Sequence, residues 1–254
     1  MGKMHDALKK VRPAGAAAPV DVADDAAERS TTTVAPRNDA DPRLVFVCDP
    51  SGRQAEEYRQ LRENVVALAT QAPLAALLVT SAGANEGKSI TAANLACALA
   101  EDSRRKVVLV DADLRTPAQH RLFGLDHTRG LSDYLAGGTM FEMVVQRWRL
   151  PNLWVLPAGR TPPNPAELLG GKRMDDLLAR LRRDYDTLIL DGPAVLPHAE
   201  PAALAPRVDG TLLVVRLLET GCADARRAVE ELKRARANVV GAVVTDLRSD
   251  GIRF

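Results

Sequence analysis

Residues 74–100 read LAALLVTSAGANEGKSITAANLACALA, and this stretch decides the fold class. It opens with a continuous apolar run over 74–80, which predicts a buried strand, and closes with a helical segment over 88–101. Between them lies AGANEGKS, residues 82–89, a run of small residues that ends in Gly-Lys-Ser. A small-residue loop that follows a strand and opens a helix is the setting of the phosphate-binding P-loop. The stretch therefore predicts a nucleotide-binding α/β domain.

The P-loop pattern gives each part of this loop a role. Backbone N–H groups curl around a phosphate, and the helix N-terminus adds the positive end of its dipole. Lys88 neutralises the β- and γ-phosphates, and the Ser89 hydroxyl is offered to Mg²⁺. Ala82 replaces the first glycine of the pattern, so we expect a backbone conformation there that alanine tolerates. The expected nucleotide-contacting residues are Gly83, Ala84, Asn85, Glu86, Gly87, Lys88, Ser89 and Ile90.

The rest of the chain alternates short apolar runs with helical segments. The runs are continuous, which indicates strands covered on both faces, and strands that alternate with helices form parallel βαβ units. We therefore expect a doubly wound, mostly parallel α/β sheet of the P-loop NTPase type. Predicted strands cover 44–48, 74–80, 106–110, 153–156, 187–190, 211–216 and 239–245. Predicted helices include 54–69, 88–101, 165–169, 174–183 and 223–236. Asn164 is expected to cap the helix that starts at Pro165, with Glu167 reaching back to the cap.

The first 43 residues differ in composition from the rest. Residues 1–11 carry apolar side chains at helical spacing, which predicts a short N-terminal helix or, equally, a fraying terminus. Residues 12–43 are rich in Ala, Pro, Asp and Thr and bury little apolar area, which predicts a disordered linker. We expect the P-loop domain to span residues 44–254.

Charge and composition exclude several classes of function. Lys and Arg total 34 and Asp and Glu total 33, so the net charge of +1 gives no reason to expect nucleic-acid binding. The three cysteines and four histidines have no metal-ligand spacing, which argues against a zinc site and for a reducing compartment. The uncharged stretch from Asn64 to Asn85 fits a helix end, a turn and a strand better than a membrane span. With no signal-peptide core in the sequence, we expect a cytoplasmic protein.

Carboxylates follow two further predicted strands. In VLVDADLR, residues 108–115, Asp111 and Asp113 stand two apart at the strand end, and in LILDGP, residues 188–193, Asp191 ends its strand as in a Walker B motif. The carboxyl ends of parallel strands open on one ligand crevice, so we expect all three near the P-loop. One carboxylate can hold the metal and its water, and another can take the proton of a hydroxyl nucleophile. A turn or cap role is the alternative for each aspartate taken alone.

The three motifs together resemble those of the bacterial tyrosine kinases, the CpsD/CapB-like P-loop kinases of capsule and exopolysaccharide assembly. Further matching segments are EEYRQLR (56–62), GLSDYLAG (130–137), NLWVLPAG (152–159) and PPNPAELL (162–169). The resemblance covers about residues 44–245. It implies an ATP- and Mg²⁺-dependent protein-tyrosine kinase with a MinD/ParA-type fold.

The resemblance also implies roles for single residues. Lys88 and Ser89 would bind the phosphates and Mg²⁺, with Asp111 and Asp191 supporting the metal. Asp113 would be the base for the tyrosine hydroxyl. Arg115 would stabilise the 111–113 segment or the substrate.

A third set of implied roles concerns assembly. Glu56, Arg59 and Arg62 match the family's E-x-x-R-x-x-R motif, which joins protomers into a ring, although a solvated charged helix face is the alternative reading. The implied partner is a membrane adaptor of the chain-length-determinant, Wzz-like type, whose cytoplasmic tail activates the kinase. The protein would then lie at the inner face of the plasma membrane through that partner.

The chain departs from the family's pattern in four respects. Its tyrosines, Tyr58, Tyr134 and Tyr185, all fall inside the predicted fold, and the family's C-terminal tyrosine cluster has no counterpart, so we expect the acceptor on a partner. The family's D-T/S-P-P segment has become Asp191-Gly192-Pro193-Ala194. Gly83 occupies the position of the signature lysine of MinD/ParA proteins, which argues against that subgroup. Thr245 stands where related ATPases often place an adenine-contacting Asn, which puts base recognition there in doubt. Two alternatives therefore stay open: an ATP-binding, non-phosphorylating oligomeric regulator of polysaccharide chain length and, less favoured, a MinD/ParA-like ATPase.

Overall fold

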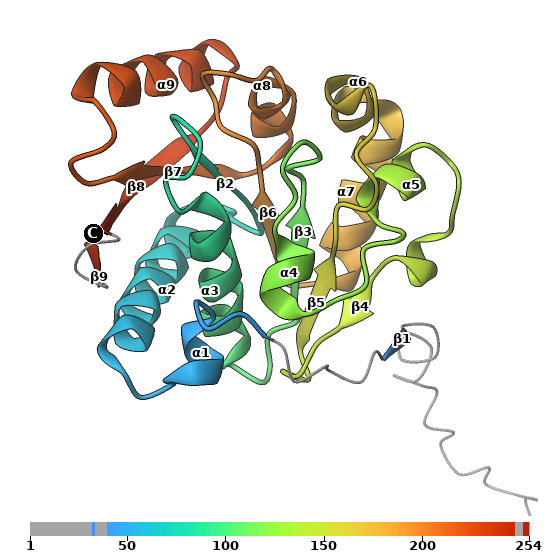
Figure 1. The fold of residues 1–254 in the computed structure, drawn as a ribbon, viewed down its shortest axis with the longest axis horizontal. Coiled ribbons are helices and arrows are strands. Elements are labelled where there is room, and N and C mark those ends of the chain that lie inside the picture. Colours follow the sequence, from blue (N-terminus) through green and yellow to red (C-terminus); the bar gives the residue numbers. More distant parts are fainter. Residues whose placement is uncertain (1–31, 34–39, 247–250, 254) are drawn as a thin grey trace, which may run out of the picture. The chain divides into compact units, whose positions relative to one another are not determined.

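The computed structural model describes residues 32–33, 40–246 and 251–253. The predicted helix over 1–11 and most of the predicted linker over 12–43 lie outside these residues, and the domain bounds stay a prediction. Among the described residues, nine strands form one sheet with helices on both faces (Figure 1). No helix of this part of the chain combines the length and the apolar character needed to cross a bilayer.

The strands and helices follow the predicted alternation. The strands are β1 (Thr32–Thr33), β2 (Ala76–Ser81), β3 (Val107–Asp111), β4 (Gln146–Arg147), β5 (Leu153–Leu156), β6 (Thr187–Asp191), β7 (Gly210–Arg216), β8 (Val239–Asp246) and β9 (Gly251–Arg253). The α-helices are α1 (Val45–Cys48), α2 (Arg53–Gln71), α3 (Lys88–Ala100), α4 (Gln119–Phe123), α5 (Leu131–Leu135), α6 (Pro165–Gly170), α7 (Lys172–Asp184), α8 (Glu200–Leu204) and α9 (Cys222–Arg234). Two short 3₁₀ helices are η1 (Phe141–Met143) and η2 (Ala205–Arg207).

The strand order places the three motif-bearing strands next to one another. The order is β1-β4-β5-β3-β6-β2-β7-β8-β9, and the six strands from β5 to β8 are mutually parallel. This confirms the doubly wound, mostly parallel sheet. β6 lies between β3 and β2, and Asp111 of β3 pairs in register with Asp191 of β6. Both carboxylates therefore reach the sheet edge where the P-loop leaves β2.

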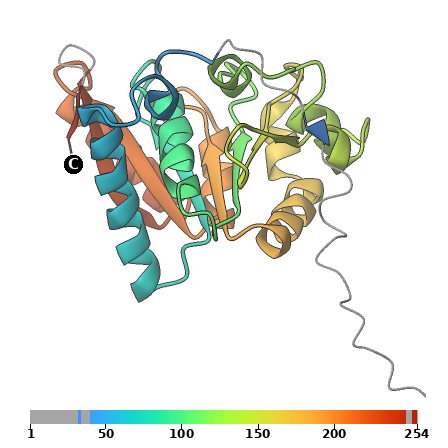
Figure 2. The same cartoon turned by 90° about the horizontal axis from the view of Figure 1, so that it is seen from below.

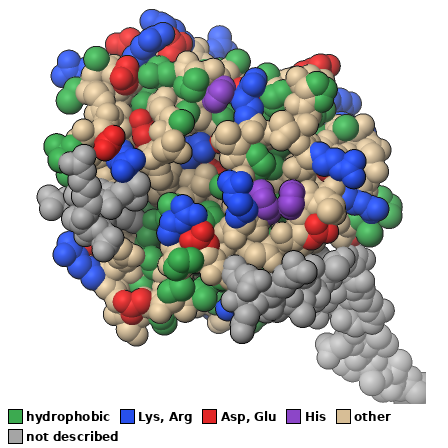
Figure 3. Space-filling model, viewed as in Figure 1, with side chains coloured by type: hydrophobic (Ala, Val, Ile, Leu, Met, Phe, Trp, Pro, Cys, Tyr) green, Lys and Arg blue, Asp and Glu red, His purple; other side chains and the backbone are tan. Residues whose placement is uncertain are grey.

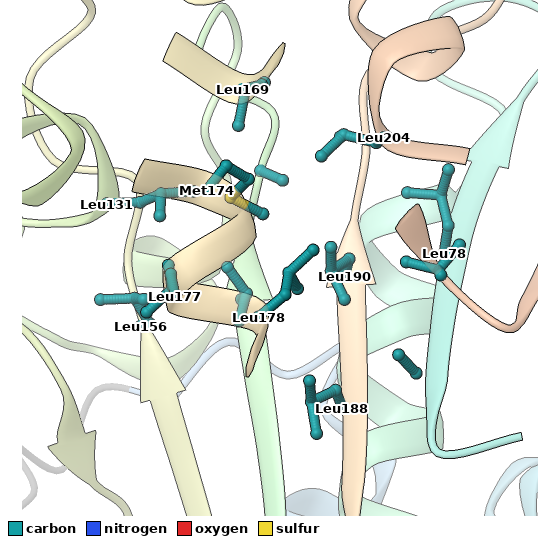
Figure 4. Packing of buried hydrophobic residues seen from close by; sticks show 14 of the residues in the cluster. Leu78, Leu131, Leu156, Leu169, Met174, Leu177, Leu178, Leu188, Leu190 and Leu204 are labelled. Atoms are coloured by element: carbon teal, nitrogen blue, oxygen red, sulfur yellow. The ribbon is translucent and has the colours of Figure 1, made fainter. Parts of the chain in front are cut away.

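A helical layer packs on each face of the sheet. Leu77 and Val79 of β2 belong to the cluster that contains the buried side chains of α2 and α3, which lie side by side (Figure 2). Leu78 belongs to the opposite cluster, with Leu177 and Leu178 of α7 (Figure 4). Alternate residues of one strand thus face different layers, which explains why the strands are apolar at every position.

Two local predictions are wrong in detail. Residues 44–48 form the short helix α1 rather than a strand, because Leu44 and Val45 are buried and Val45 N–H donates to Asn94 Oδ1 of α3 at 2.9 Å. Packing on α3 here outweighs the strand preference of a Val/Phe-rich segment. Helix α6 does start at Pro165, but the Asn164 amide donates to the Glu167 carboxylate at 2.6 Å and makes no cap bond to the backbone.

Candidate active site

The P-loop joins β2 to α3 through two left-handed backbone positions. Asn85 has φ +60° and Gly87 has φ +94°, whereas Ala82 has no positive φ, as its side chain requires. A Cβ on Gly87 would lie 3.3 Å from the Thr245 methyl group. Glycine is therefore favoured at this position both by its backbone angle and by the close approach of β8.

Glu86 holds the loop from within. Its carboxylate accepts hydrogen bonds from the N–H groups of Ala82 (3.1 Å) and Gly83 (3.0 Å). The Thr245 hydroxyl donates to the Glu86 carbonyl at 2.7 Å. The side chain of Glu86 is thus committed to the loop, and only its backbone can face a phosphate. Thr245, in turn, supports the P-loop through this bond.

The P-loop opens into a cavity of about 500 Å³, a size typical of small-ligand sites. Figure 3 shows histidine and basic side chains around a hollow near the middle of this face. Several lining residues carry no motif and were missed in the sequence; they are Arg43, Thr116, Arg121, His198 and Arg216. Three of them, Arg43, Arg121 and Arg216, carry guanidinium groups, which favour a polyanionic ligand.

Lys88 and Asp113 form a buried ion pair at the floor of this cavity. The Lys88 Nζ lies 2.8 Å from Asp113 Oδ2, and the two side chains are 12% and 2% exposed. The Thr116 backbone N–H donates to Asp113 Oδ1 and the Thr116 hydroxyl to Oδ2, both at 2.9 Å. Burial alone would raise the pKa of Asp113, but Lys88 and the Thr116 hydrogen bonds outweigh it and lower the pKa. The carboxylate is therefore held in its charged, proton-accepting form.

Asp111 and Asp191 stand beside this pair and share Gln119. Asp111 Oδ2 accepts the N–H groups of Ala118 (3.0 Å) and Gln119 (2.9 Å), while Asp191 Oδ2 accepts Gln119 Nε2 at 2.8 Å. The same amide group donates to the Ser89 carbonyl at 3.0 Å. Gln119 therefore ties both carboxylates to the P-loop helix, although no sequence motif marks it.

These two carboxylates fit a divalent cation. The Oδ1 atoms of Asp111 and Asp191 are buried and have no hydrogen-bond partner in the described structure. Burial, reinforced by the charge of Asp191, raises the pKa of Asp111 well above its usual range, and burial also raises that of Asp191. A cation would offset this repulsion. No set of three or more His, Cys, Asp or Glu ligands occurs in the described residues, and Mg²⁺ usually needs only one or two carboxylates plus substrate phosphates.

We expect Asp111→Asn to raise thermal stability in magnesium-free buffer. The folded-state pKa of Asp111 lies above the ordinary value of 3.8, so its charge destabilises the folded protein increasingly as pH rises above 3.8. At neutral pH a gain of about 1 kcal/mol would raise Tm by roughly 2–4 °C, and the gain would vanish below the ordinary pKa. Asp209→Asn is the control and should change stability in the opposite direction. Burial alone would raise the pKa of Asp209, but its ion pair with Arg182 lowers it. An unchanged or lower Tm for Asp111→Asn at neutral pH would contradict the assignment.

Arg115 lies outside the cavity lining. Its Nε donates to Glu200 Oε1 of α8 at 2.7 Å, and no bond from its side chain to the 111–113 segment occurs in the described structure. The structure therefore gives no support to the first of its two implied roles, stabilisation of that segment.

The E-x-x-R-x-x-R motif lies on the surface of α2. Arg59 Nη2 and Arg62 Nη1 both contact the carboxylate of Glu101, just beyond α3, at 2.7 and 2.9 Å. Arg59 also lies over the Phe46 ring, 5.4 Å from its centroid, and pairs with Glu56 at 3.4 Å. The motif residues are thus together, with both arginines engaged within the chain.

No tyrosine of the chain is well exposed. Tyr58 and Tyr185 are buried, with 3% and 9% of their surface exposed, and Tyr134 is half-buried. Burial raises the pKa of the Tyr58 and Tyr185 hydroxyls. All three lie inside the fold, as expected from the sequence.

Comparisons with known proteins show the family to which the chain belongs. Residues 77–253 match the family described as "CobQ/CobB/MinD/ParA nucleotide binding domain". The chain is 36% identical over 201 residues to tyrosine-protein kinase YwqD of Bacillus subtilis, a match that covers 79% of this chain and 84% of YwqD. It is 31% identical over 209 residues to a putative tyrosine-protein kinase in the cps region of Klebsiella pneumoniae, covering 82% of this chain but 29% of that protein.

Solved structures give the same result. The kinase domain of Escherichia coli tyrosine kinase ETK superimposes with a TM-score of 0.78 at 31% identity, covering 84% of each chain. The match covers most of the chain rather than the nucleotide-binding motifs alone. This chain therefore belongs to the family of bacterial tyrosine-protein kinases, which is built on the MinD/ParA-type nucleotide-binding domain.

Proposed function

We propose that this protein transfers the γ-phosphate of ATP to a tyrosine of a partner protein during assembly of a capsular or other extracellular polysaccharide. The observation that carries the proposal is the buried Lys88–Asp113 pair at the floor of the P-loop cavity. A cation and a carboxylate at that position match the two needs of the reaction, phosphate binding and proton removal. The name of the Klebsiella relative, which refers to its cps region, supports the link to polysaccharide.

Each residue of the site then has one task. The P-loop amides and Lys88 hold the phosphates, while Ser89, Asp111 and Asp191 hold Mg²⁺. When bound, Mg²⁺ neutralises charge on the phosphate oxygens. Asp113 takes the proton of the tyrosine hydroxyl. The tyrosine oxygen then forms a bond to the γ-phosphorus as the bond between that phosphorus and the ADP oxygen breaks.

Lys88 couples ATP binding to this proton transfer. Its ammonium group lowers the pKa of Asp113 while the two are paired. Phosphate oxygens compete for the same ammonium group, which weakens the pair and makes Asp113 a stronger base. The base is thereby strengthened when the phosphate donor is present.

The acceptor tyrosine belongs to a partner in this proposal, because the chain's own tyrosines are buried or half-buried. The test is incubation of the protein with ATP, Mg²⁺ and its membrane partner, followed by mass spectrometry. Phosphotyrosine on the partner is the expected result. If no partner protein carries phosphotyrosine after the incubation, the proposal is wrong.

The same buried tyrosines favour one alternative, an oligomeric regulator of polysaccharide chain length that binds or slowly hydrolyses ATP without phosphorylating a protein. That function requires ATP-dependent assembly but no base. It predicts that Asp113→Asn still forms oligomers in the presence of ATP. It also predicts that the unsubstituted protein produces no phosphotyrosine. Phosphotyrosine that disappears in Asp113→Asn would exclude the alternative.

Gln119→Leu tests the proposed magnesium site. The substitution removes the amide that orients Asp191 and bonds to the Ser89 carbonyl, and puts an apolar side chain of similar size in its place. Loss of a group that orients metal ligands typically costs 10–100-fold in metal affinity. We expect a loss of about that size in the Mg²⁺ dependence of ATP binding, measured by calorimetry. Exposed Gln60→Leu on α2 is the control, and equal Mg²⁺ dependence of both variants would contradict the assignment.

The proposed assembly is a ring of this chain, held at the inner face of the plasma membrane by a chain-length-determinant adaptor. It is supported by the clustering of Glu56, Arg59 and Arg62 on α2. In a ring, the arginines would exchange Glu101 for carboxylates of a neighbouring protomer. Arg59→Ala with Arg62→Ala should then abolish ATP-dependent assembly in sedimentation velocity. A double variant that assembles normally would leave the motif with its intrachain role alone.

A further inference from the structure

Glu200 is a buried carboxylate that the proposed reaction does not yet use. It opens α8, is 1% exposed, and its Oε1 lies 2.7 Å from Arg115 Nε. Its Oε2 is buried and has no hydrogen-bond partner among the described residues. A buried carboxylate without a cation is costly, so this ion pair fixes the arginine as much as it satisfies the glutamate.

Arg115 is close in sequence to Asp113 but does not itself line the P-loop cavity. It follows Asp113 by two residues on the loop between β3 and α4, and this loop rises between α8 and α6 (Figure 1). Two residues span at most about 7 Å. A ligand group held by Arg115 would therefore lie within a few peptide residues of a tyrosine whose hydroxyl reaches Asp113.

The guanidinium group of Arg115 has donors to spare. Its side chain is 44% exposed, and within the described structure only its Nε has a hydrogen-bond partner. The two Nη groups form a planar fork suited to a carboxylate. Glu200, being buried, cannot touch a substrate and can act only through Arg115.

We propose that Glu200 is a positioning residue that holds Arg115 to bind an acidic side chain next to the acceptor tyrosine. The inference rests on the proposed function and adds a substrate class, tyrosine segments flanked by Asp or Glu. Arg121 of the P-loop cavity, which has no ion pair among the described residues, adds attraction for such a segment. The recognition is electrostatic, so it weakens at high ionic strength.

Two synthetic peptides provide the test, one with a tyrosine between glutamates and one with the same tyrosine between glutamines. Binding to the full chain with Mg²⁺ and a non-hydrolysable ATP analogue is measured by fluorescence anisotropy, so the readout does not require transfer. The unsubstituted protein should bind the acidic peptide about tenfold more tightly than the neutral one. Glu200→Gln and Arg115→Lys should each remove most of this difference and leave the affinity for the ATP analogue unchanged.

The double variant decides whether Glu200 acts through Arg115. Adding Glu200→Gln to Arg115→Ala should weaken acidic-peptide binding no further, whereas independent effects would add. Exposed Glu230→Gln on α9 is the matched control, and thermal unfolding of each variant shows whether it is folded. Equal binding of the two peptides, additive losses, or equal losses for both peptides in Glu200→Gln would overturn the inference.

Transfer to the same peptides separates this inference from the proposed function. Preferential binding of the acidic peptide, with no phosphotyrosine formed on the peptides or on the partner protein, would refute the kinase proposal and keep the anion-binding role of Arg115. Phosphotyrosine formed equally on both peptides would support the kinase proposal and refute the role of Arg115 in recognising acidic segments.

Discussion

Lys88→Met should reduce phosphotyrosine formation by about a thousandfold. The substitution keeps an unbranched side chain, one atom shorter, but removes the cation that faces both the cavity and Asp113. Removing one preorganised group that stabilises transition-state charge costs roughly 10²–10³ in rate, and loss of phosphate binding adds to this. Transfer is measured with radiolabelled ATP at saturating partner concentration.

The same variant should also be less stable. Asp113 is buried and loses its ion-pair partner, and breaking a buried pair costs about 3–5 kcal/mol. Stability is measured by urea unfolding at neutral pH. Lys172→Met, at an exposed position on α7, is the matched control and should leave both properties unchanged. A Lys88→Met protein that binds ATP and transfers phosphate normally would refute the site.

Asp113→Asn should lower the transfer rate by about 10²–10⁴-fold and leave ATP bound, since general-base catalysis contributes that range. Asparagine preserves the shape of the side chain, and its one oxygen can still accept the Thr116 backbone N–H, but its amide nitrogen cannot accept the Thr116 hydroxyl and the side chain cannot take a proton. The readout is kcat at saturating ATP together with the ATP dissociation constant. An equal loss in ATP affinity and in kcat would indicate a structural role instead.

The pH dependence gives a second check on Asp113. Its folded-state pKa lies below the ordinary value of 3.8, so its stabilising ion pair is present above 3.8 and is lost as pH falls through the lowered pKa. Asp113→Asn should therefore reduce the free energy of unfolding at neutral pH and have no such effect in strong acid. Exposed Asp176→Asn on α7 is the control. A stability loss that grows on acidification would contradict the assignment.

Much of the fold could be predicted because the strands are buried on both faces. Continuous apolar runs such as those of β3, β5 and β6 leave no other reading, and their limits agree with the structure to within one residue. The segment that became α1 differs because its environment is one-sided: it packs on α3 and hydrogen-bonds Asn94. Nothing local in its sequence announces that contact.

Part of the candidate site could also be predicted from the sequence. Lys88, Asp111, Asp113 and Asp191 follow strands in recognisable motifs, and adjacent parallel strands bring them together. The structure shows that these four residues lie close together, whereas their roles in the reaction are still predictions.

Gln119 and Glu200 were missed, and Thr245 was considered only for base recognition, because these groups act across long sequence separations. Gln119 reaches a carboxylate 72 residues away, Thr245 reaches a carbonyl 159 residues away, and Glu200 meets an arginine 85 residues away. None carries a motif, and each is defined only by the packed structure. Glu86 was assigned to the nucleotide, yet its carboxylate closes the loop on itself.

The most direct test of the account is phosphoamino-acid analysis of the partner after incubation with γ-labelled ATP and Mg²⁺, carried out in parallel with the unsubstituted protein and Asp113→Asn. We expect label on tyrosine with the unsubstituted protein and almost none with the variant. Label on no residue, label on a residue other than tyrosine, or equal tyrosine labelling by both proteins would contradict it.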